Sequence, residues 1–378
     1  MTEMSFQVAL LHDSWYPNTG GGIIHVEKLA EYLAKNHNCS VDIITKSTDG
    51  SHQPVDSSVN VVQISGTNTN TRIVNEFRYS YGVLNQIYRN EYDIIHAHTN
   101  NSAIILQLLR FSEESTIFTV HGADLDFNVT FTGTKLDSVY SNIRKIILKK
   151  FKYNQLISVS SELERILSNY HSSVSYIPNG VDVDEFPEPT QQDSDEILFV
   201  GRLRPKKNPE DIIKAMPYIL ESHPEAHLHI VGEGPLYDSL AELVSAKSLT
   251  DSVTLHGYVS DEVLNDLYSR CKVFPLVSEW EGHPLVLLEA WASGMVVVGS
   301  DVEGIREFIK GQPYGELVPL HDPKQLAKTI SNLLDDQTEL NKKAVDARDF
   351  VSQNYTWEQT ADRTFQVYQS LTETSRLQ

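Results

Sequence analysis

Short apolar runs alternate with segments of helical periodicity along almost the whole chain. This alternation is typical of βαβ units, in which parallel strands form a sheet and helices cover both of its faces. In such a sheet, ligands bind beyond the carboxyl ends of the strands. The predicted strands are residues 6–11, 41–44, 59–64, 93–96, 116–120, 156–159 and 174–177, followed by 197–200, 227–231, 253–256, 273–276 and 296–300.

The two halves of the chain differ in charge and meet at a turn-rich segment. Residues 1–180 contain 14 Lys and Arg against 17 Asp and Glu, whereas residues 181–378 contain 17 against 34. A length of 378 residues also favours two domains. Proline, Asn-Gly and acidic residues mark the joint. We therefore predict α/β domains at 1–178 and 190–356, a linker at 179–189 and a C-terminal helix at about 357–378.

The composition narrows the partners and the compartment. A net charge of -20 argues against nucleic acid as a partner. Cys39 and Cys271 are isolated in the sequence, which predicts neither a disulfide framework nor a metal site. The N-terminus is acidic, and no apolar run has the length of a signal peptide core or a membrane span. We expect a reducing, cytoplasmic location.

Residues 279–299, which read EWEGHPLVLLEAWASGMVVVG, contain two carboxylates eight residues apart. The pattern predicts a loop, a helix and a buried strand. Glu281 would lie in the loop at the helix mouth, where free backbone N–H groups favour phosphate. Glu289 would lie on the helix two turns further in, among apolar residues, and the alternative is a place on the solvent face of that helix. Pro284 is acceptable in the first helical turn but removes one N–H donor.

Glycines and cations follow three of the predicted strands. Gly20-Gly21-Gly22 follows the first strand without the spacing of a dinucleotide fingerprint, and a flexible turn is the alternative. Gly201 opens a turn that carries Arg202, Arg204, Lys206 and Lys207 at the mouth of the next helix. Cations at that place suit a diphosphate, whose charge grows as it leaves; the alternative is a solubilising turn. Gly232 and Gly234 follow the strand at 227–231.

Histidines occur at the ends of two strands in the first half. His96 and His98 could offer two ligands to a metal, but no third ligand has a suitable spacing, so we predict polar residues at a strand end. His121 lies in the segment Thr119–Asp124, in which Gly122 lets the backbone approach a ligand. We predict a role in the site for His121; the alternative is a hydrogen-bonded histidine at a strand end.

Residues 143–153 predict a basic amphipathic helix, with five cations interleaved with apolar residues. Docking on an anionic membrane is the functional interpretation, and a solvated helix packed on the sheet is the alternative. In the next segment, Ser161 and Glu164 have the spacing of a capping box.

The stretch around Glu281 resembles the motif of two glutamates with seven intervening residues found in retaining glycosyltransferases of the GT-B fold, in particular glycosyltransferase family 4. The chain keeps Gly282, Leu285, Ala290 and Gly294 of that pattern, and departs from it at His283 and Pro284, where an aromatic residue and a glycine are usual. Other matching segments occur in the same order: Thr-x-His-Gly-x-Asp at 119–124, Ile-Pro-Asn-Gly-Val-Asp at 177–182, and Gly-Arg-Leu at 201–203 with a later Lys207. The resemblance covers roughly residues 6–370.

The resemblance implies two Rossmann-like domains that face a cleft, with the C-terminal helix crossing back to the first domain. It implies transfer of a sugar, with retention, from a nucleoside-diphosphate sugar to a glycan, a lipid or a lipid-linked saccharide, without a metal cofactor. The implied catalytic residues are His121, Arg202, Lys207 and Glu281. The implied donor-binding residues are Gly21, Gly22, Gly201, Gly232, Gly234, Tyr258, Val259, Gly282, His283, Pro284, Leu285 and Glu289. The implied acceptor-side residues are His98, Asp124 and Ser160.

Three alternatives remain open at this point. The same fold could serve a nucleotide-sugar epimerase, or a sugar-nucleotide-binding protein without catalysis, which the departure at His283 and Pro284 would favour. A metal-dependent transferase would instead use an Asp-x-Asp triplet. The chain has three such triplets: Asp124/Asp126, Asp182/Asp184 and Asp193/Asp195.

Overall fold

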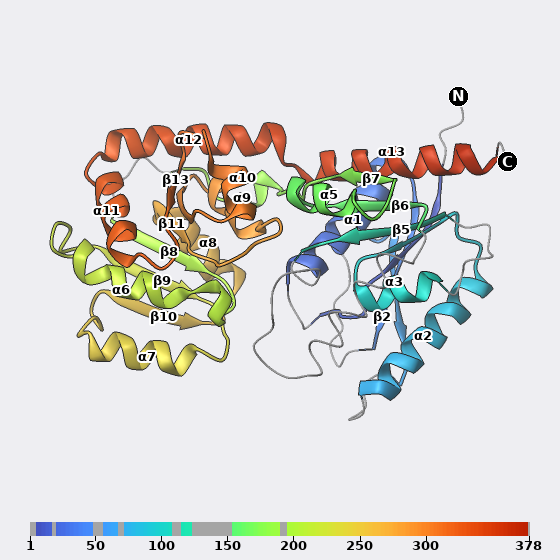
Figure 1. Cartoon of the computed structure of the whole chain (residues 1–378), viewed down its shortest axis with the longest axis horizontal. Helices are drawn as coiled ribbons and strands as arrows, with labels where there is room; N and C mark the ends of the chain where they lie inside the picture. The colour runs from blue at the N-terminus through green and yellow to red at the C-terminus, as the bar shows by residue number, and fades with distance from the viewer. Residues whose placement is uncertain are drawn as a thin grey trace. The chain divides into compact units, whose positions relative to one another are not determined.

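The structure, a computed structural model, describes residues 5–16, 20–47, 56–66, 72–107, 115–122, 153–189 and 195–376. The chain divides into two compact units (Figure 1). The first contains residues 1–179 together with 357–378, and the second contains residues 180–356. Of the residues predicted as a linker, Asn179 therefore belongs to the first unit and 180–189 to the second.

The first unit is built on a parallel sheet of seven strands in the order β3-β2-β1-β4-β5-β6-β7. Its strands are β1 (Gln7–Leu11), β2 (Ser40–Lys46), β3 (Val59–Ile64), β4 (Ile94–Ala97), β5 (Ser115–Val120), β6 (Gln155–Ser158) and β7 (Val174–Tyr176). Its described helices are α1 (Gly21–His37), α2 (Arg72–Arg89), α3 (Asn100–Leu106), α5 (Ser161–Leu167) and α13 (Trp357–Arg376).

The alternation of side chains along β1 explains how helices cover both faces of this sheet. Val8 and Leu10 point to the core shared with α1 and α13, whereas Ala9 and Leu11 point to the core shared with α2, α3 and α5. Phe365 of α13 contacts Phe6, with 5.4 Å between the ring centroids. The C-terminal helix therefore contacts the first unit, as predicted.

The second unit is built on a parallel sheet of six strands in the order β10-β9-β8-β11-β12-β13. Its strands are β8 (Glu196–Val200), β9 (His227–Val231), β10 (Val253–Gly257), β11 (Val273–Leu276), β12 (Val296–Ser300) and β13 (Gly315–Val318). Its helices are α6 (Pro209–Ile219), α7 (Tyr237–Ala246), α8 (Asp261–Arg270), α9 (Leu285–Ala292), α10 (Glu303–Ile309), α11 (Pro323–Leu334) and α12 (Gln337–Asn354).

Helices cover both faces of the second sheet as well. Ile197 and Phe199 of β8 face the core formed with α6, α7 and α11, whereas Leu198 faces the core formed with α8, α9, α10 and α12. The two parallel α/β sheets confirm the predicted fold class. Within the described residues, every helix is too short or too polar to cross a membrane.

Each sheet has one point at which the strand order reverses. In the first sheet this point lies between β1 and β4, and in the second it lies between β8 and β11. The connections that leave the two strands at such a point run to opposite faces of the sheet, so their carboxyl ends border a crevice that commonly binds ligands. The fold therefore directs attention to the loops after these four strands.

Candidate functional site

Lys207 and Glu281 meet beside the point of strand reversal in the second sheet. Lys207 ends a short 3-10 turn, Pro205–Lys207, in the loop after β8, and Glu281 lies in the loop after β11. Nζ of Lys207 forms an ion pair with Oε1 of Glu281, which is largely buried. The N–H of Glu279 also donates to the carbonyl oxygen of Lys206 at 2.9 Å. The fold thus brings together two residues that the sequence assigned to one site.

The backbone of the loop that carries Glu281 packs closely against the first turn of α10. A Cβ atom on Gly304, in the first turn of that helix, would lie only 1.9 Å from the carbonyl oxygen of Glu281. Only glycine permits this approach, because a methyl group would have to displace the loop backbone. The sequence analysis did not assign Gly304 to the site; a glycine inside a helical segment was the available signal.

The glycines after β8 and β9 allow their two loops to touch through the backbone. Gly232 has a φ of 131°, and a Cβ atom there would lie 2.0 Å from the carbonyl oxygen of Gly201. A Cβ atom on Gly234 would lie 2.3 Å from the carbonyl oxygen of Leu203. The N–H of Leu203 donates to the carbonyl oxygen of Glu233 at 2.9 Å. The close contact between the two loops therefore requires glycine at these positions, whether or not a ligand binds.

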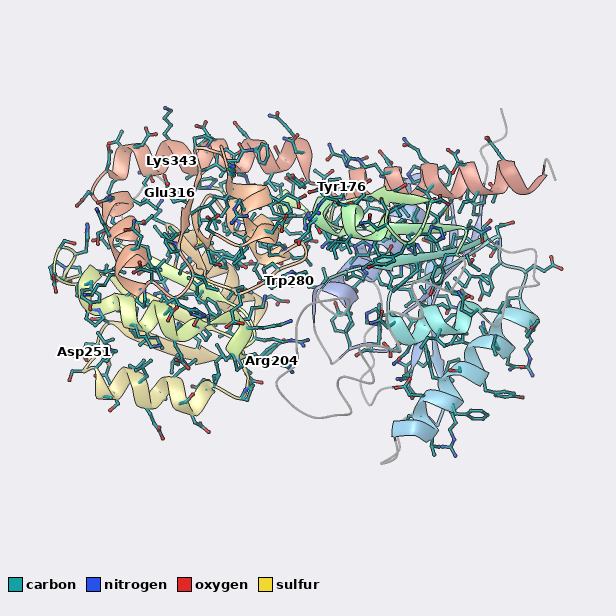
Figure 2. The ribbon with its side chains drawn as sticks, viewed as in Figure 1. Tyr176, Arg204, Asp251, Trp280, Glu316 and Lys343 are labelled. Carbon is teal, nitrogen blue, oxygen red and sulfur yellow. The ribbon has the colours of Figure 1, made fainter. Side chains whose placement is uncertain are left out.

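Cations remain exposed on the turn after β8. Arg202 follows Gly201 and has an exposed side chain. Figure 2 shows Arg204, from the same turn, and Trp280, from the loop after β11, on one side of the second unit. The carboxyl edge of this sheet thus presents positive charge near a buried carboxylate, an arrangement suited to a diphosphate.

Glu289 lies on α9 and is bound by Tyr268 of α8. The Tyr268 hydroxyl donates to Oε2 of Glu289 at 2.8 Å. Burial raises the pKa of the Glu289 carboxyl group above its ordinary value. Tyr268 is itself buried, and nothing in the apolar periodicity of its helix singled it out. The sequence pattern therefore gave no indication that Tyr268 binds Glu289.

The start of α9 differs from the prediction. The helix begins at Leu285, and Pro284 precedes it as the N-cap with φ -73° and ψ 105°. Pro284 is thus outside the first turn, and Glu289 lies about one turn inside the helix rather than two turns beyond its mouth. The extended ψ of Pro284 keeps this residue outside the helix, which begins one residue later.

His283 takes the position at which the family pattern has an aromatic residue. Its imidazole is buried and packs edge-on against Phe308, with ring centroids 4.6 Å apart and an interplanar angle of 82°. The ring therefore fills an aromatic environment. Its neighbours Gly282 and Leu285 are also buried.

Tyr258 and Val259 follow β10, the edge strand of the second sheet. A register shift between Leu255 and Gly257 precedes them. Tyr258 is 73% exposed and Val259 is partly buried. The strand order places them two strands away from β8. They are therefore available for a flat ligand beside the diphosphate region.

A cluster of histidines occupies the carboxyl edge of the first sheet. Nδ1 of His98 and Nε2 of His121 are 3.2 Å apart. The ring of His25, from α1, lies 4.6 Å from that of His121 and 5.2 Å from that of His98, measured between centroids. The structure thus brings the two predicted histidines together. It adds His25, which the sequence did not indicate because this residue lies among the apolar residues of a helix.

The buried histidines of this cluster are electrically neutral near pH 7. Burial lowers the pKa of His25 to about 4, although Nδ1 of the ring is bonded to Oδ1 of Asn179 at 2.8 Å. Burial also lowers the pKa of His98 well below its ordinary value. A neutral imidazole offers one donor and one acceptor, so the cluster can bind hydroxyl groups.

The glycine-rich loop of the first unit leads into α1. Gly21 and Gly22 are the first two residues of that helix. A Cβ atom on Gly22 would lie 3.2 Å from Nε2 of His12, the residue after β1. Gly22 therefore lets α1 begin beside the His12 ring, which is buried.

Ser160 and His96 have structural roles in the first unit. Ser160 is the N-cap of α5, and its hydroxyl oxygen accepts from the N–H of Leu163. The predicted capping box from Ser161 was wrong by one residue, because Ser160 keeps the extended backbone that a cap requires. His96 is bonded through Nδ1 to the hydroxyl of Tyr368 at 2.8 Å, and through Nε2 to Thr119. Asp124 and residues 143–152 of the predicted basic helix lie outside the described residues. Tyr153, the last residue of that prediction, is buried and is not helical.

Two sets of residues could hold a metal ion within the part of the chain that the structure describes. One is His25, His98 and His121, and the other is Glu196, His229 and Cys271. The sequence analysis found no third ligand for His98 because the additional histidines come from distant segments. Neither Asp182 nor Asp184 joins such a set among the described residues, while Asp126 and Asp193 lie outside them.

Comparisons with known proteins give the family and the fold. The family model for glycosyl transferases group 1 matches residues 181–349, and the model for glycosyltransferase family 4 matches residues 19–185. Between them the two models cover residues 19–349. The structure is similar to that of sucrose-phosphate synthase from Thermosynechococcus elongatus, with a TM-score of 0.84 at 24% identity over 98% of this chain and 100% of that chain. The fold is therefore GT-B, as predicted.

Two curated relatives match over most of their length. An uncharacterized glycosyltransferase of Methanocaldococcus jannaschii is 28% identical, over 96% of this chain and 97% of its own. The UDP-Gal:alpha-D-GlcNAc-diphosphoundecaprenol alpha-1,3-galactosyltransferase of Escherichia coli is 26% identical, over 81% and 82%. The chain therefore belongs to glycosyltransferase family 4, the glycosyl transferases group 1, and is a retaining hexosyl-type glycosyltransferase that depends on a nucleotide sugar.

Proposed function

We propose that the protein transfers a hexosyl group from a UDP-sugar to a lipid-linked saccharide at an anionic membrane surface. The observation that carries the donor half of this proposal is the ion pair between Lys207 and Glu281 at the strand reversal of the second sheet. It holds a cation and a carboxylate side by side where a diphosphate and its sugar would lie. The acceptor half depends on the outer face of α2.

In the proposed complex, the donor diphosphate lies against Arg202 and Lys207. Negative charge grows on the diphosphate as the bond to the anomeric carbon breaks, so fixed cations stabilise the transition state more than the ground state. The diphosphate competes with Glu281 for the Lys207 ammonium group. Glu281 is then available to the sugar ring, on which positive charge develops.

The nucleoside would bind further along the same sheet edge. Glu289, oriented by Tyr268, accepts hydrogen bonds from the two ribose hydroxyl groups, since a carboxylate can bind a diol through both oxygens. The base lies near Tyr258 and Val259. We take the base to be uracil, because the relative from Escherichia coli carries UDP-Gal in its name.

The transfer proceeds on one face of the sugar. The bond from the anomeric carbon to the diphosphate oxygen breaks, and a bond from the acceptor hydroxyl oxygen forms on the same face. The acceptor proton passes to the departing diphosphate. In this scheme the ring nitrogens of His98 and His121 hold sugar hydroxyl groups.

A lipid-linked acceptor is favoured by the outer face of α2. The inner face of this helix is apolar, with Tyr79, Val83 and Ile87 buried. The outer face is also apolar: Phe77 is 74% exposed, Tyr81 is 67% exposed and Tyr88 is 74% exposed. Spacings of four and seven residues place these three side chains on one side of the helix.

The exposed face of α2 has the composition of a membrane-interface helix. Aromatic rings with polar tips are suited to the boundary between lipid headgroups and acyl chains. Arg78 and Arg89 are exposed beside the aromatic residues and would attract anionic lipid. The name of the Escherichia coli relative gives it a diphosphoundecaprenol-linked acceptor, which supports the same interpretation.

The experiment incubates the full chain with labelled UDP-hexoses, with and without vesicles that contain an N-acetylglucosaminyl diphospholipid. We expect UDP release that depends on the lipid acceptor, and label that partitions into the organic phase. Transfer only to a water-soluble glycan would refute the acceptor class. Conversion of the donor without any acceptor would instead identify an epimerase, and no turnover of any donor would identify a binding protein.

A further inference from the structure

Three potential metal ligands meet in the second unit, away from the Lys207–Glu281 pair. Glu196 is the first residue of β8, His229 lies within β9, and Cys271 directly follows α8. Their ligand atoms lie within 4.8 Å of one another. The N–H of Lys272 donates to the carbonyl oxygen of Glu196 at 3.0 Å, which fixes the turn after α8 to the start of β8. Lys207 and Glu281 follow the carboxyl ends of β8 and β11, whereas Glu196 begins β8 and Cys271 precedes β11. The cluster therefore lies toward the amino ends of these strands.

His229 directs an unsatisfied nitrogen into this cluster. Alternation along β9 places it on the face covered by α8, since Leu228 and Ile230 belong to the core on the other face. The side chain is only 9% exposed. Its Nδ1 lies 3.0 Å from Nε2 of His256, whereas its Nε2 is buried without a hydrogen-bond partner. Buried polar atoms are normally satisfied, so this one calls for an explanation.

The contacts of the His229 ring leave that nitrogen available to a cation. Oε2 of the Glu196 carboxylate lies 3.7 Å from Nε2, which is beyond hydrogen-bond distance. When Nδ1 donates its proton to His256, Nε2 presents a lone pair. This is the second-sphere arrangement that orients metal-binding histidines.

We propose that Glu196, His229 and Cys271 bind one divalent cation of the zinc class. A thiolate with an imidazole selects Zn²⁺ over the hard cations Mg²⁺ and Ca²⁺, and a carboxylate completes a set of three. The thiolate and the carboxylate together balance the two charges of the ion. Solvent takes the fourth position, because Glu196 is only partly buried. Cys271 is buried and its thiol is protonated in the metal-free protein, so binding releases one proton to solvent.

The position of the site indicates a structural role. The ion would link β8, β9 and the turn between α8 and β11 near the amino ends of the strands. The proposed donor site lies at the opposite, carboxyl edge of the sheet. Metal binding should therefore change the stability of the second unit and leave the transfer reaction independent of added metal. This separates the inference from the proposed function, whose failure would not affect it.

Substitution of Arg270 should change the metal affinity in a direction that can be predicted. Its Nη1 donates to both carboxylate oxygens of Glu196 at 2.8 Å. Each oxygen retains a lone pair for a metal, but a guanidinium group so close to the cation repels it. Removal of this charge should tighten metal binding. If Glu196 and Arg270 formed only a surface ion pair, the same substitution would have no effect on metal affinity.

The experiment titrates the chelator-treated full chain with Co²⁺, which stands in for Zn²⁺ and reports thiolate ligation through a charge-transfer band in the near ultraviolet. We expect one equivalent bound and a clear thiolate band. Cys271→Ser should abolish the band, and His229→Gln should weaken binding by about tenfold to a hundredfold, the usual range for a lost ligand or its support. Cys39→Ser is the matched control, because Cys39 is the other buried cysteine of the chain and lies in the first unit.

The controls keep the proposal falsifiable. Arg270→Gln should lower the dissociation constant, and His98→Gln, in the histidine cluster of the first unit, should leave the band unchanged. A band that survives Cys271→Ser, or that disappears in Cys39→Ser, would overturn the proposal. So would an absence of stoichiometric Co²⁺ binding. If Cys271→Ser does not fold, His229→Gln and Arg270→Gln decide the question by their opposite effects on affinity.

Discussion

The Lys207 ammonium group pairs with the Glu281 carboxylate, although 74 residues separate them in the sequence. The pair joins the loops that follow β8 and β11, the two strands at which the order of the second sheet reverses. In the proposed complex the diphosphate takes over this cation when the donor binds, before the bond breaks, so that little reorganisation remains for the reaction itself.

The first prediction concerns the charge of Lys207. Lys207→Ala should reduce turnover on the order of 100-fold, because the variant loses one of the two cations that we propose to stabilise the leaving diphosphate. Arg202→Ala should have a similar effect. Lys206→Ala is the matched control, since its exposed side chain lies on the same turn and its contact with Glu279 is made by the backbone. Equal rates for Lys207→Ala and Lys206→Ala in a steady-state assay would exclude the role assigned to Lys207.

The second prediction divides the roles of the two glutamates. Glu289→Ala should mainly raise the Michaelis constant for the donor, because the proposed complex places Glu289 on the ribose, whose contacts are similar in the ground and transition states. Glu281→Ala should mainly lower turnover, because the proposed complex places Glu281 beside the bond that breaks. Steady-state kinetics with varied donor and saturating acceptor distinguish the two. A loss confined to the Michaelis constant in both variants would make Glu281 only a binding group.

The same assay can test the partner of Glu289. Tyr268→Phe removes the hydroxyl group that donates to Glu289 and retains the ring. We expect a change in the same direction as Glu289→Ala, but smaller. An unchanged Michaelis constant for the donor would mean that Tyr268 does not orient the carboxylate.

The third prediction concerns Gly304. Gly304→Ala should destabilise the protein by about 1–3 kcal/mol through overpacking and should lower turnover, since the added methyl group meets the carbonyl oxygen of Glu281. Glu303→Ala changes the adjacent position in the same helical turn and provides the control. Thermal unfolding and turnover are measured on both variants. Wild-type turnover in Gly304→Ala would show that the loop moves without consequence.

The fourth prediction concerns the stability of the protein at acidic pH. The ordinary pKa of His25 is 6.5, and burial lowers it to about 4 in the folded protein. As the pH falls, the unfolded chain therefore takes up this proton before the folded protein does. The neutral His25 ring contributes on the order of 3 kcal/mol to the free energy of unfolding. This contribution is complete above about pH 6.5 and is lost as the pH falls through 4. Urea unfolding between these pH values should show falling stability.

The contribution of His25 can be separated from that of its neighbours. His96 and His98 also have pKa values lowered by burial, so they add to the slope with the same sign. His25→Gln, which can keep a hydrogen bond to Asn179, should reduce the slope of stability against pH without removing it. An identical slope in this variant would show that the His25 ring gains its proton at an ordinary pH.

The fifth prediction concerns the outer face of α2. The double substitution Phe77→Ser and Tyr81→Ser should weaken binding to anionic vesicles by about tenfold or more, because two buried rings are worth at least 1.4 kcal/mol. High salt should weaken the binding of the wild-type protein as well. Tyr218→Ser, which removes a partly exposed aromatic residue of the second unit, is the control. Equal co-sedimentation of all variants would exclude this surface.

The βα alternation predicted the two sheets because each strand carries its own local signal. β13 was missed, because Gly315–Val318 is short and includes a charged residue. Lys207 and Glu281 could be assigned to one site because both follow strand ends in a recognisable pattern. His25 could not be assigned with His98 and His121, since only the tertiary fold brings α1 against the ends of β4 and β5. The contact of Tyr268 with Glu289 has the same origin.

The attachment of α13 to the first unit also affects the order in which a ribosome can complete the protein. The first unit begins the chain, yet Tyr368, which binds the buried His96, emerges only after the entire second unit has been translated. Until then the face of the first sheet that receives Phe365 and Tyr368 is covered by α1 but lacks the part of its cover that α13 supplies. We therefore expect the second unit to be complete during synthesis, whereas the first unit gains its final helix only at the end.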